Sequence, residues 1–476
     1  MLFNSIAFAV FLPVTFLLYW FLFNKNLKGQ NFFLLVVSYV FYGWWDWRFL
    51  VLIAFSSGLD FFVGLQLQKI ENHRKRKFFF ALSCIVNLGF LGFFKYYNFF
   101  ENSFVDAFAA AGIHLEVRTL RIILPVGISF YTFQSLSYTI DIYRKKITPT
   151  KDILAFFAFV SFFPHLVAGP IMRAANLLPQ FNKRRTFDYN LASDGMRQIL
   201  WGLFKKMVIA DGCAACVNQI FGSYETLPGS VLLLGAVYFA FQIYGDFSGY
   251  SDIAIGTARL FGFDLMQNFA YPYFSRDIAE FWRRWHISLT SWFRDYVYIP
   301  LGGSRKTLGL TVRNTLIVFL LCGFWHGANW TFIVWGLLHA LYFIPLLLLK
   351  RNREHIDVVA LNKLLPSIKE LFQMLLTFFL VVIAWIFFRA ENLKEAFNYI
   401  AHLMSPSLFS FPTVYRSNMI LVAILIIVEW IQREKQHALE IEGIKHPAFR
   451  WIIYSVVCFT IYFFGINHQP FIYFQF

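Results

Sequence analysis

The hydrophobic residues of this chain occur in long continuous runs that are separated by short polar segments. Apolar windows of about 17–25 residues, the length that an α-helix needs to cross the hydrocarbon core of a bilayer, recur along the chain. A transmembrane strand would alternate hydrophobic and polar residues instead, and runs such as 78–94 show no such alternation. The pattern predicts an all-α polytopic membrane protein.

About 11–12 of these runs are predicted to cross the membrane, with about 20 residues for each crossing. The first run lacks the basic start and the small-residue cleavage site of a secretory signal, so it is predicted to be a span. The predicted spans are 6–23, 31–47, 49–67, 78–94, 121–143, 231–244, 250–263, 310–324, 330–349, 371–388, 419–431 and 451–464.

One apolar run, 153–171, is predicted not to cross. It contains Pro164, Gly169 and Pro170, residues that interrupt a helix. Interrupted backbone at membrane depth is tolerated only where protein or a water-filled cavity surrounds it. Basic residues flank the run on both sides, so we expect a re-entrant segment whose two ends lie on the same side of the membrane.

Segment 276–298 is predicted to be a single amphipathic helix in the plane of the membrane. On a helical projection Arg276, Arg283 and Arg294 fall opposite an apolar stripe, and His286 lies on the border between the two faces. The stripe consists of Ile278, Phe281, Trp282, Trp285, Leu289, Trp292, Phe293 and Tyr296. The arginines have two interpretations: they bind lipid headgroup phosphates, or they contact a phosphate-bearing substrate from the cytoplasm.

Two further apolar regions contain charged residues. Segment 196–210 is amphipathic and carries Lys205 and Lys206, so it is expected at the inner surface of the membrane. Asp246 lies in the glycine-containing connection between two predicted spans, together with Ser248. An acidic residue inside a membrane segment is rare and commonly has a function.

Composition agrees with a membrane protein and excludes other classes. Hydrophobic residues make up 58% of the 476 residues and charged residues 14%, whereas soluble domains carry roughly 25% charged residues. The net charge of +15 does not indicate nucleic-acid binding, because Lys and Arg fall in short loops, where they set membrane orientation. The five Cys residues are odd in number, so no disulfide framework is expected, and Cys213 and Cys216 are interpreted as packing residues.

His326 is the main candidate for chemistry. It follows an apolar run, and Asn329, one helical turn further on, is expected to supply a hydrogen-bond partner. An imidazole titrates near neutral pH and can take a proton from a hydroxyl nucleophile. The alternative is a structural histidine that hydrogen-bonds between helices. His286 and His326 do not form a metal-ligand motif, so no metal is expected, and neither a nucleophile elbow nor a P-loop is present.

Three separated blocks resemble the signature blocks of the membrane-bound O-acyltransferases, and in particular the branch of bacterial alginate O-acetylation membrane proteins. The blocks are FWRRWHISLT at 281–290, YIPLGG at 298–303 and GFWHGANW at 323–330. Supporting blocks are MLFNS at 1–5, FPHLVAGP at 163–170, DFSGYSD at 246–252 and FIYFQF at 471–476. The resemblance extends over essentially the whole chain.

The resemblance implies one membrane domain in which tilted helices form a ring around a central tunnel. Its sections would be 1–150, 151–345, which contains both histidines, and 346–476. His326 matches the catalytic histidine of the family, and His286 matches the second signature histidine near the tunnel. The candidates for substrate or tunnel contacts are Trp325, Asn329, Asp246, Ser248, Arg283 and Arg284.

The implied activity is transfer of an acetyl group from a cytoplasmic thioester, acetyl-CoA, across the bacterial inner membrane. The receiver would be a periplasmic SGNH or acetyl-esterase-like partner, which acetylates a polysaccharide such as alginate. No bound cofactor is implied. Alternatives are modification of peptidoglycan or teichoic acid, acylation of a lipid within the bilayer, and a transporter with a histidine proton relay. No internal repeat of the transporter kind is evident in the sequence.

The basic loops predict the orientation of the chain. We expect the N-terminus and the loop 95–120 to face the periplasm. The loops expected in the cytoplasm are 69–77, 144–151, 350–353 and 433–435. Labelling of single introduced cysteines with a membrane-impermeant reagent tests this orientation, and labelling of 69–77 from outside the cell would contradict it.

Overall fold

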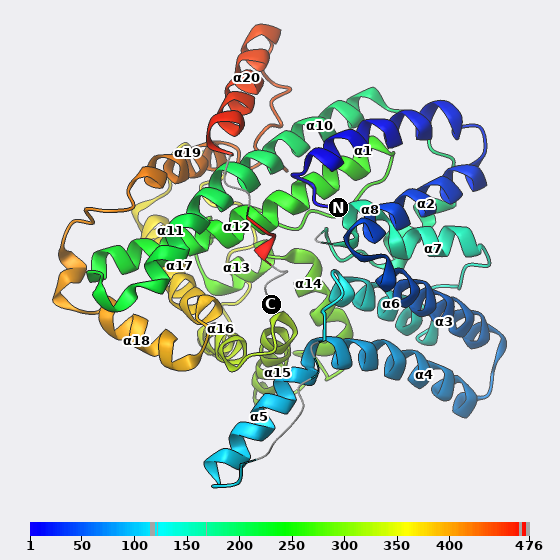
Figure 1. Ribbon diagram of the computed structural model, residues 1–476, viewed down its shortest axis with the longest axis horizontal. Coiled ribbons are helices and arrows are strands. Elements are labelled where there is room, and N and C mark those ends of the chain that lie inside the picture. Colours follow the sequence, from blue (N-terminus) through cyan, green and yellow to red (C-terminus); the bar gives the residue numbers. More distant parts are fainter. Residues whose placement is uncertain (115–119, 121, 168, 466–468, 473–476) are drawn as a thin grey trace. The chain divides into compact units, whose positions relative to one another are not determined.

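The computed structural model describes residues 1–114, 120, 122–167, 169–465 and 469–472, and the regular elements of these residues are all helical (Figure 1). The all-α prediction is therefore confirmed for the part of the chain that the structure describes. The described chain divides into two compact units. One comprises Met1–Ala192 and Thr257–Leu265, and the other comprises Ser193–Gly256 and Met266–Phe476.

The first unit contains the N-terminal helices. Their bounds are α1 (Ile6–Leu17), α2 (Leu27–Asp46), α3 (Leu50–Lys69), α4 (His73–Leu91), α5 (Tyr97–Ala110), α6 (Ile128–Tyr143), α7 (Ile153–Ser161), α8 (Phe163–Leu166) and α9 (Ala174–Phe181), with the short turns η1 (Leu18–Leu22), η2 (Trp47–Phe49) and η3 (Gly92–Tyr96). α10 (Tyr189–Leu203) begins in this unit and continues in the second.

Hydrogen bonds between buried side chains join three of these helices. The carboxylate of Asp60 on α3 accepts bonds from Ser83 Oγ on α4 at 2.6 Å and from Asn87 Nδ2 at 3.0 Å. Thr139 Oγ1 on α6 lies 3.4 Å from the same carboxylate. Such bonds hold apolar helices together where the hydrophobic effect offers no preference between protein and lipid.

The predicted interruption of run 153–171 is confirmed. α7 ends at Ser161, and α8 is a single turn with Pro164 in its first turn. The segment is almost wholly buried in protein, and Nε2 of His165 lies 2.9 Å from Oε1 of Gln134. Ala168, which belongs to the same predicted segment, lies outside the described residues. The side of the membrane on which the segment ends stays a prediction.

The prediction that 95–120 is a loop is wrong for its first part. Residues 97–110 form α5, which continues from α4 through η3 as one helical stretch, His73–Ala110. Its aromatic residues recur at helical spacing, and the rings of Phe104 and Phe108 contact each other at 4.5 Å. Residues 115–119 of the predicted loop lie outside the described residues.

The second unit contains the helices that carry the signature histidines. Their bounds are α11 (Asp211–Gly222), α12 (Gly229–Leu260), α13 (Ile278–Arg284), α14 (Ile287–Phe293), α15 (Leu308–His326), α16 (Trp330–Leu348), α17 (Ile368–Arg389), α18 (Leu393–Leu403), α19 (Ser417–Ile431) and α20 (Pro447–Phe464), with the turns η4 (Phe204–Ala210), η5 (Tyr224–Thr226), η6 (Pro272–Phe274), η7 (Arg294–Tyr298) and η8 (Pro406–Phe409). The last four residues of α12 belong to the first unit.

The prediction of two spans at 231–244 and 250–263 is wrong, because α12 is one continuous helix. The glycines that suggested a turn are packing positions. A Cβ at Gly249 would lie 2.7 Å from the carbonyl oxygen of Gly202, and a Cβ at Gly245 would lie 2.9 Å from that of Lys205. Small residues let two helix backbones approach this closely.

The expected surface position of segment 196–210 is wrong at its lysine pair. Lys205 and Lys206 are both buried, on the π-helical turn η4. Lys205 Nζ lies 2.6 Å from the carboxylate of Asp252. Lys206 Nζ lies 2.8 Å from Asp211 and 2.7 Å from Asp246. The two lysines pair with acidic residues of α11 and α12 inside the protein. Their charges are therefore compensated without water or lipid headgroups at the membrane surface.

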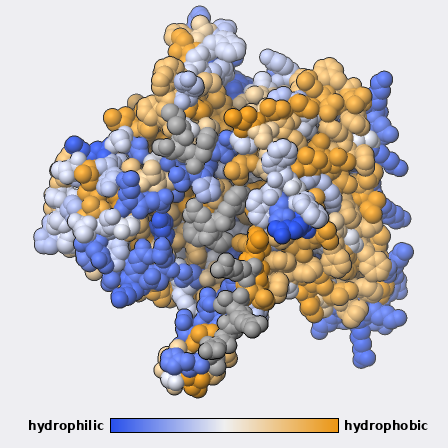
Figure 2. Space-filling model, in the orientation of Figure 1, coloured by the Kyte–Doolittle hydropathy of each residue, from blue (hydrophilic) through white to orange (hydrophobic). Residues whose placement is uncertain are grey.

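Seven helical stretches of the described chain are long and apolar enough to cross a membrane. One of them, Leu27–Lys69, contains both α2 and α3. Two shorter apolar helices, Ile6–Leu22 and Ser417–Ile431, add to these stretches. The number of about 11–12 crossings stays a prediction. Figure 2 shows hydrophobic residues over much of the face formed by α1 to α4, where Val40, Phe55 and Ile85 are exposed.

Replacing Lys206 with Met should destabilise the second unit. The substitution leaves the carboxylates of Asp211 and Asp246 buried without their cation, a change that costs about 3–5 kcal/mol. Thermal unfolding of the purified protein in detergent measures the effect, with Lys25→Met, in an exposed loop, as the control. An unchanged unfolding midpoint for Lys206→Met would contradict the structural role of the ion pairs.

Candidate active site

α15 and α16 form a tightly packed helical hairpin. A Cβ at Gly323 would overlap the carbonyl oxygen of Phe332, and a Cβ at Gly336 would overlap that of Phe319. The two glycines therefore face each other where the backbones approach most closely. This contact lies one helical turn before His326, so it sets the position of that histidine against α16.

His326 is the last residue of α15 and is 2% exposed. The helix ends because Gly327 adopts an extended conformation, with φ −161° and ψ 154°. A Cβ at Gly327 would collide with the ring of Phe332, so a larger residue does not fit there. The chain then turns directly into α16.

The side-chain amide of Asn329 does not form the expected hydrogen bond with His326 and bonds to two other residues instead. Asn329 is the N-cap of α16, where its Oδ1 accepts a bond from the backbone N–H of Thr331 at 3.1 Å. Its Nδ2 donates to the carbonyl of Glu391 at 2.7 Å. The expectation assumed a helix through residue 329, whereas α15 ends three residues earlier.

The imidazole of His326 lies among aromatic rings. Its centroid lies 4.9 Å from that of Trp325, 5.0 Å from that of Trp335 and 5.4 Å from that of Phe388. The rings come from α15, α16 and α17, so three helices enclose the histidine. An enclosure of this kind keeps bulk water away from the imidazole.

The prediction of one continuous amphipathic helix over 276–298 is wrong. The segment forms α13, α14 and η7, and the break lies at Trp285 and His286. His286 has φ +43° and ψ 55°, a left-handed conformation that a residue other than glycine seldom adopts. Asn268 holds the start of α14 in place, because its Oδ1 accepts a bond from Ser288 Oγ at 2.8 Å.

His286 is completely buried instead of lying on the border of a lipid-facing helix. Its ring centroid lies 4.5 Å from that of Phe247 and 6.0 Å from that of Trp325. Burial lowers the pKa of His286 to about 3, so the imidazole is neutral at physiological pH. A neutral imidazole presents one N–H donor and one acceptor nitrogen.

Trp325 joins the two signature histidines. Its indole contacts His286, the N-cap residue of α14, at 6.0 Å between ring centroids and His326, on its own helix, at 4.9 Å. The histidines are 40 positions apart in the numbering of the sequence. The fold therefore brings them to one indole, as expected for two histidines of a single site.

The apolar stripe of the predicted surface helix faces protein instead of lipid. Phe281, Trp282 and Trp285 are each no more than 5% exposed. Trp282 Nε1 donates a hydrogen bond to Nδ1 of His339 at 3.2 Å, and the ring of Trp285 lies 5.1 Å from that of Trp385. The stripe is thus an internal contact of α13 with α16 and α17.

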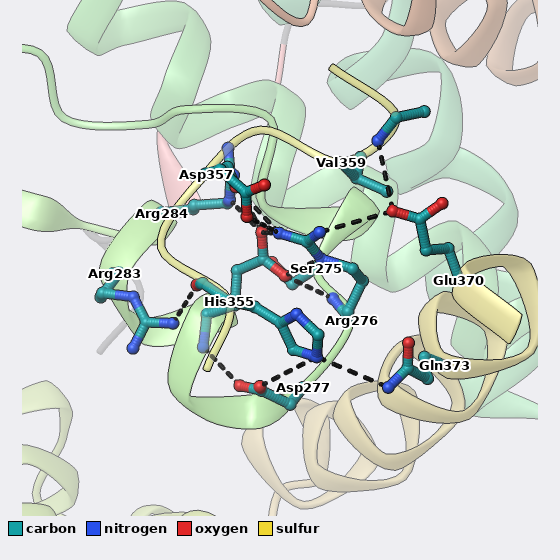
Figure 3. Close-up of polar contacts among 12 residues, drawn as sticks. Ser275, Arg276, Asp277, Arg283, Arg284, His355, Asp357, Val359, Glu370 and Gln373 are labelled. Atoms are coloured by element: carbon teal, nitrogen blue, oxygen red, sulfur yellow. Dashed lines mark hydrogen bonds and ion pairs between the residues drawn. The ribbon is translucent and has the colours of Figure 1, made fainter. Parts of the chain in front are cut away.

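Arginines of α13 and its N-terminal approach form an ion cluster around one buried carboxylate (Figure 3). The carboxylate of Glu280 accepts bonds from Arg276 Nε at 3.1 Å and from Arg284 Nη2 at 2.8 Å. Arg276 also reaches Asp357 Oδ1 at 2.8 Å, and this guanidinium holds the pKa of Asp357 below its usual range. The cluster joins α13 to the loop between α16 and α17.

The same loop is held by further arginine bonds to its backbone. Arg283 Nη1 donates to the carbonyl of Asn352 at 2.9 Å, and its Nη2 donates to that of His355. Arg284 Nη2 donates to the carbonyl of Asp357 at 2.7 Å. These bonds give Arg283 and Arg284 partners within the protein. The expected contacts of the two arginines with a substrate stay a prediction.

Asp246 connects α12 to the C-terminal segment. Its Oδ2 accepts a bond from the backbone N–H of Ile472 at 2.6 Å, and Lys206 Nζ donates to the carbonyl of Gln469 at 3.0 Å. The ring of Phe471 lies 6.1 Å from that of Phe247, which contacts His286. Residues 473–476 of the same sequence block lie outside the described residues.

Ser248 lies on α12 and is 1% exposed, and its hydroxyl has no hydrogen-bond partner within the described part of the chain. The roles expected for Ser248 and Asp246 in substrate contact stay predictions.

The Cys213 and Cys216 thiols are free and buried, which agrees with their interpretation as packing residues.

Residues 145–390 match the model of MBOAT, the membrane-bound O-acyltransferase family, and this range includes both signature histidines. The chain belongs to the membrane-bound O-acyltransferase family. It is 42% identical to the probable alginate O-acetylase AlgI of Pseudomonas aeruginosa, over 87% of this chain and 76% of the relative. The resemblance found in the sequence blocks is confirmed.

The names of other relatives specify other polymers. The chain is 37% identical to the peptidoglycan O-acetyltransferase of Helicobacter pylori, over 83% of this chain and 78% of the relative. A teichoic acid D-alanyltransferase of Streptococcus thermophilus is 31% identical over 45% of this chain and 55% of its own length. This membrane-bound O-acyltransferase is therefore an acyl-transferring enzyme with several membrane passes.

The enclosure of the two histidines suits acyl transfer by this acyltransferase. A neutral imidazole within hydrogen-bond reach of a hydroxyl can remove its proton during attack on an acyl carbon. An activated acyl group is open to hydrolysis, and a site that excludes water limits that side reaction. Sequence reasoning missed His339, although a histidine four residues after Trp335 on one helix face is a visible signal.

The Gly323 contact offers a test of how His326 is positioned. Gly323→Ala should lower acyl transfer by about 100-fold, because a shift of about 1 Å at a reacting group can cost that much. Gly309→Ala is the matched control, since Gly309 lies on the same helix with open space around its Cα. Equal activity of the two variants at equal protein levels would contradict the importance of this contact.

Proposed function

We propose that this acyltransferase moves an acetyl group from cytoplasmic acetyl-CoA across the bacterial inner membrane, for O-acetylation of an extracellular polysaccharide such as alginate. The observation that carries the proposal is the pair of signature histidines on the single indole of Trp325. The match to probable alginate O-acetylases over most of the chain supports the choice of acetyl group and polymer.

In this proposal His326 is the base. It takes the proton of an acceptor hydroxyl as the oxygen attacks the thioester carbonyl carbon. The tetrahedral adduct then releases the thiolate by cleavage of the C–S bond, and the imidazolium returns its proton to the sulfur. The products are an O-acetyl ester and a free thiol. His286, neutral and buried beside Trp325, positions the acyl group or the acceptor.

The acceptor hydroxyl is proposed to belong to a periplasmic SGNH or acetyl-esterase-like partner, which passes the acetyl group to the glycan. The similarity to a peptidoglycan O-acetyltransferase supports a second candidate polymer, the cell wall. Transfer to teichoic acid has less support, because the named relative matches only 45% of this chain. Acetyl content of separately purified exopolysaccharide and peptidoglycan distinguishes the two polymers.

His326→Ala should lower polymer O-acetylation in cells by at least about 100-fold, the usual contribution of general acid–base catalysis. His286→Ala should lower it less, because that residue does not carry the proton in this proposal. The matched control is His402→Ala, which changes an exposed histidine of α18. The acetyl content of the polymer is measured together with a blot of membrane fractions.

Normal acetylation by the His326→Ala protein would exclude this histidine as the base and leave it a structural residue. His326→Gln separates the two roles further, because glutamine can hydrogen-bond but cannot take the proton at neutral pH. Equal loss in both variants, with normal protein levels, is the expected result.

A further inference from the structure

A third histidine lies in the same aromatic core as the two signature histidines. His339 is in the middle of α16, among apolar residues, and is fully buried. It lies outside the sequence blocks that carry the family resemblance. A polar residue at such a position normally has a specific partner.

The partner of His339 is a tryptophan of α13. Trp282 Nε1–H donates a hydrogen bond to Nδ1 of His339 at 3.2 Å. Because Nδ1 accepts this bond, His339 is neutral and carries its proton on Nε2. Nε2 has no hydrogen-bond partner among the residues described, and the ring of Phe281 stacks at 6.0 Å from that of His339. These surroundings are unsuited to proton exchange with water.

His339 contacts Trp335, which also contacts His326, and Trp282, which precedes His286 by four residues. Trp335, one turn earlier on α16, lies 4.9 Å from His339 and 5.0 Å from His326 between ring centroids. Trp282 lies on α13, the helix whose end leads directly into His286. The rings of Trp282 and Trp335 also contact each other at 5.7 Å. His339 therefore occupies the junction between the element before His286 and the helix that packs against His326.

We propose that His339 is a positioning residue of the acyl-transfer site: by accepting the Trp282 bond and packing against Trp335, it holds the His286 segment in register with His326. The assignment rests on the proposed function. Two properties of the His339 side chain matter for this role: its volume and the hydrogen-bond acceptor at Nδ1. A side chain that filled the space without this atom would leave the indole N–H of Trp282 buried and unpaired.

The choice of substitutions follows from this property. His339→Asn places an amide oxygen near the position of Nδ1 and keeps the acceptor. His339→Leu keeps an apolar volume and removes the acceptor. Trp282→Phe removes the donor and keeps an aromatic ring. The double variant His339→Leu with Trp282→Phe removes both partners, which avoids an unpaired buried group.

Acetyl transfer is measured in inverted membrane vesicles that contain the full chain and its native acceptors, with labelled acetyl-CoA as the probe. We expect His339→Leu to lower kcat by about 10–100-fold, the order of loss that misplacement of a reacting group causes. KM for acetyl-CoA and the midpoints of the pH–rate profile should stay unchanged, because His339 does not exchange the reacting proton. His339→Asn should recover most of the activity.

The double variant should be no slower than His339→Leu alone, since both single changes break the same bond. Wild-type kcat in His339→Leu, equal defects in the Asn and Leu variants, or additive losses in the double variant would overturn the proposal. All rates are divided by the amount of folded protein in the vesicles, so a variant with low expression is still compared directly.

A second cycle measures the unfolding midpoints of the same four proteins in detergent. Non-additive midpoint shifts are expected from the Trp282–His339 bond and do not depend on any activity. If wild-type vesicles show no acetyl transfer but the unfolding midpoints shift non-additively, the proposed function is wrong and the Trp282–His339 bond is confirmed. Additive shifts would overturn the positioning role itself.

Discussion

Inside a membrane protein a charged side chain has no bulk water to solvate it, and this constraint places the charged residues of the second unit. Lys206 is buried because Asp211 and Asp246 are buried beside it. Glu280 is buried because Arg276 and Arg284 share its carboxylate. The Lys206 pairs join η4 to α11 and α12, whereas the Glu280 pairs lie within α13 and its N-terminal approach, and Arg276 extends them to Asp357 in the loop between α16 and α17. One ion cluster therefore ties η4 to α11 and α12, and the other ties α13, which leads directly to His286, to the loop between α16 and α17.

The candidate active site is built from aromatic rings. His326 is enclosed by Trp325, Trp335 and Phe388, and His286 contacts Phe247 and the same Trp325. Aromatic side chains combine large contact area with few rotatable bonds, so they hold an imidazole in one orientation at low entropic cost. The charged clusters hold the helices, and the rings hold the histidines. Separating the two tasks keeps the histidines of this acyltransferase away from water.

Sequence patterns predicted the long apolar helices, and they failed where a glycine or a charged residue has a role in tertiary packing. Runs 330–349 and 371–388 agree closely with α16 and α17. Gly249, by contrast, suggested a turn and is a packing position in α12. Segment 276–298 has the periodicity of a surface helix, yet its stripe is buried, and Trp282 and Trp285 contact α16 and α17. Periodicity identifies an apolar face but does not say whether lipid or protein covers it.

By itself, the sequence determined that this chain is a helical membrane protein and an O-acyltransferase with His286 and His326 in its signature blocks. Length and apolarity suffice for the first conclusion, since a bilayer accepts few other structures. The blocks suffice for the second. Only the tertiary structure decided that both histidines contact Trp325, that Asn329 caps α16, and that His339 bonds to Trp282. These contacts join residues far apart in the sequence, and they depend on where α15 ends and where α13 breaks, which the packing of neighbouring helices sets.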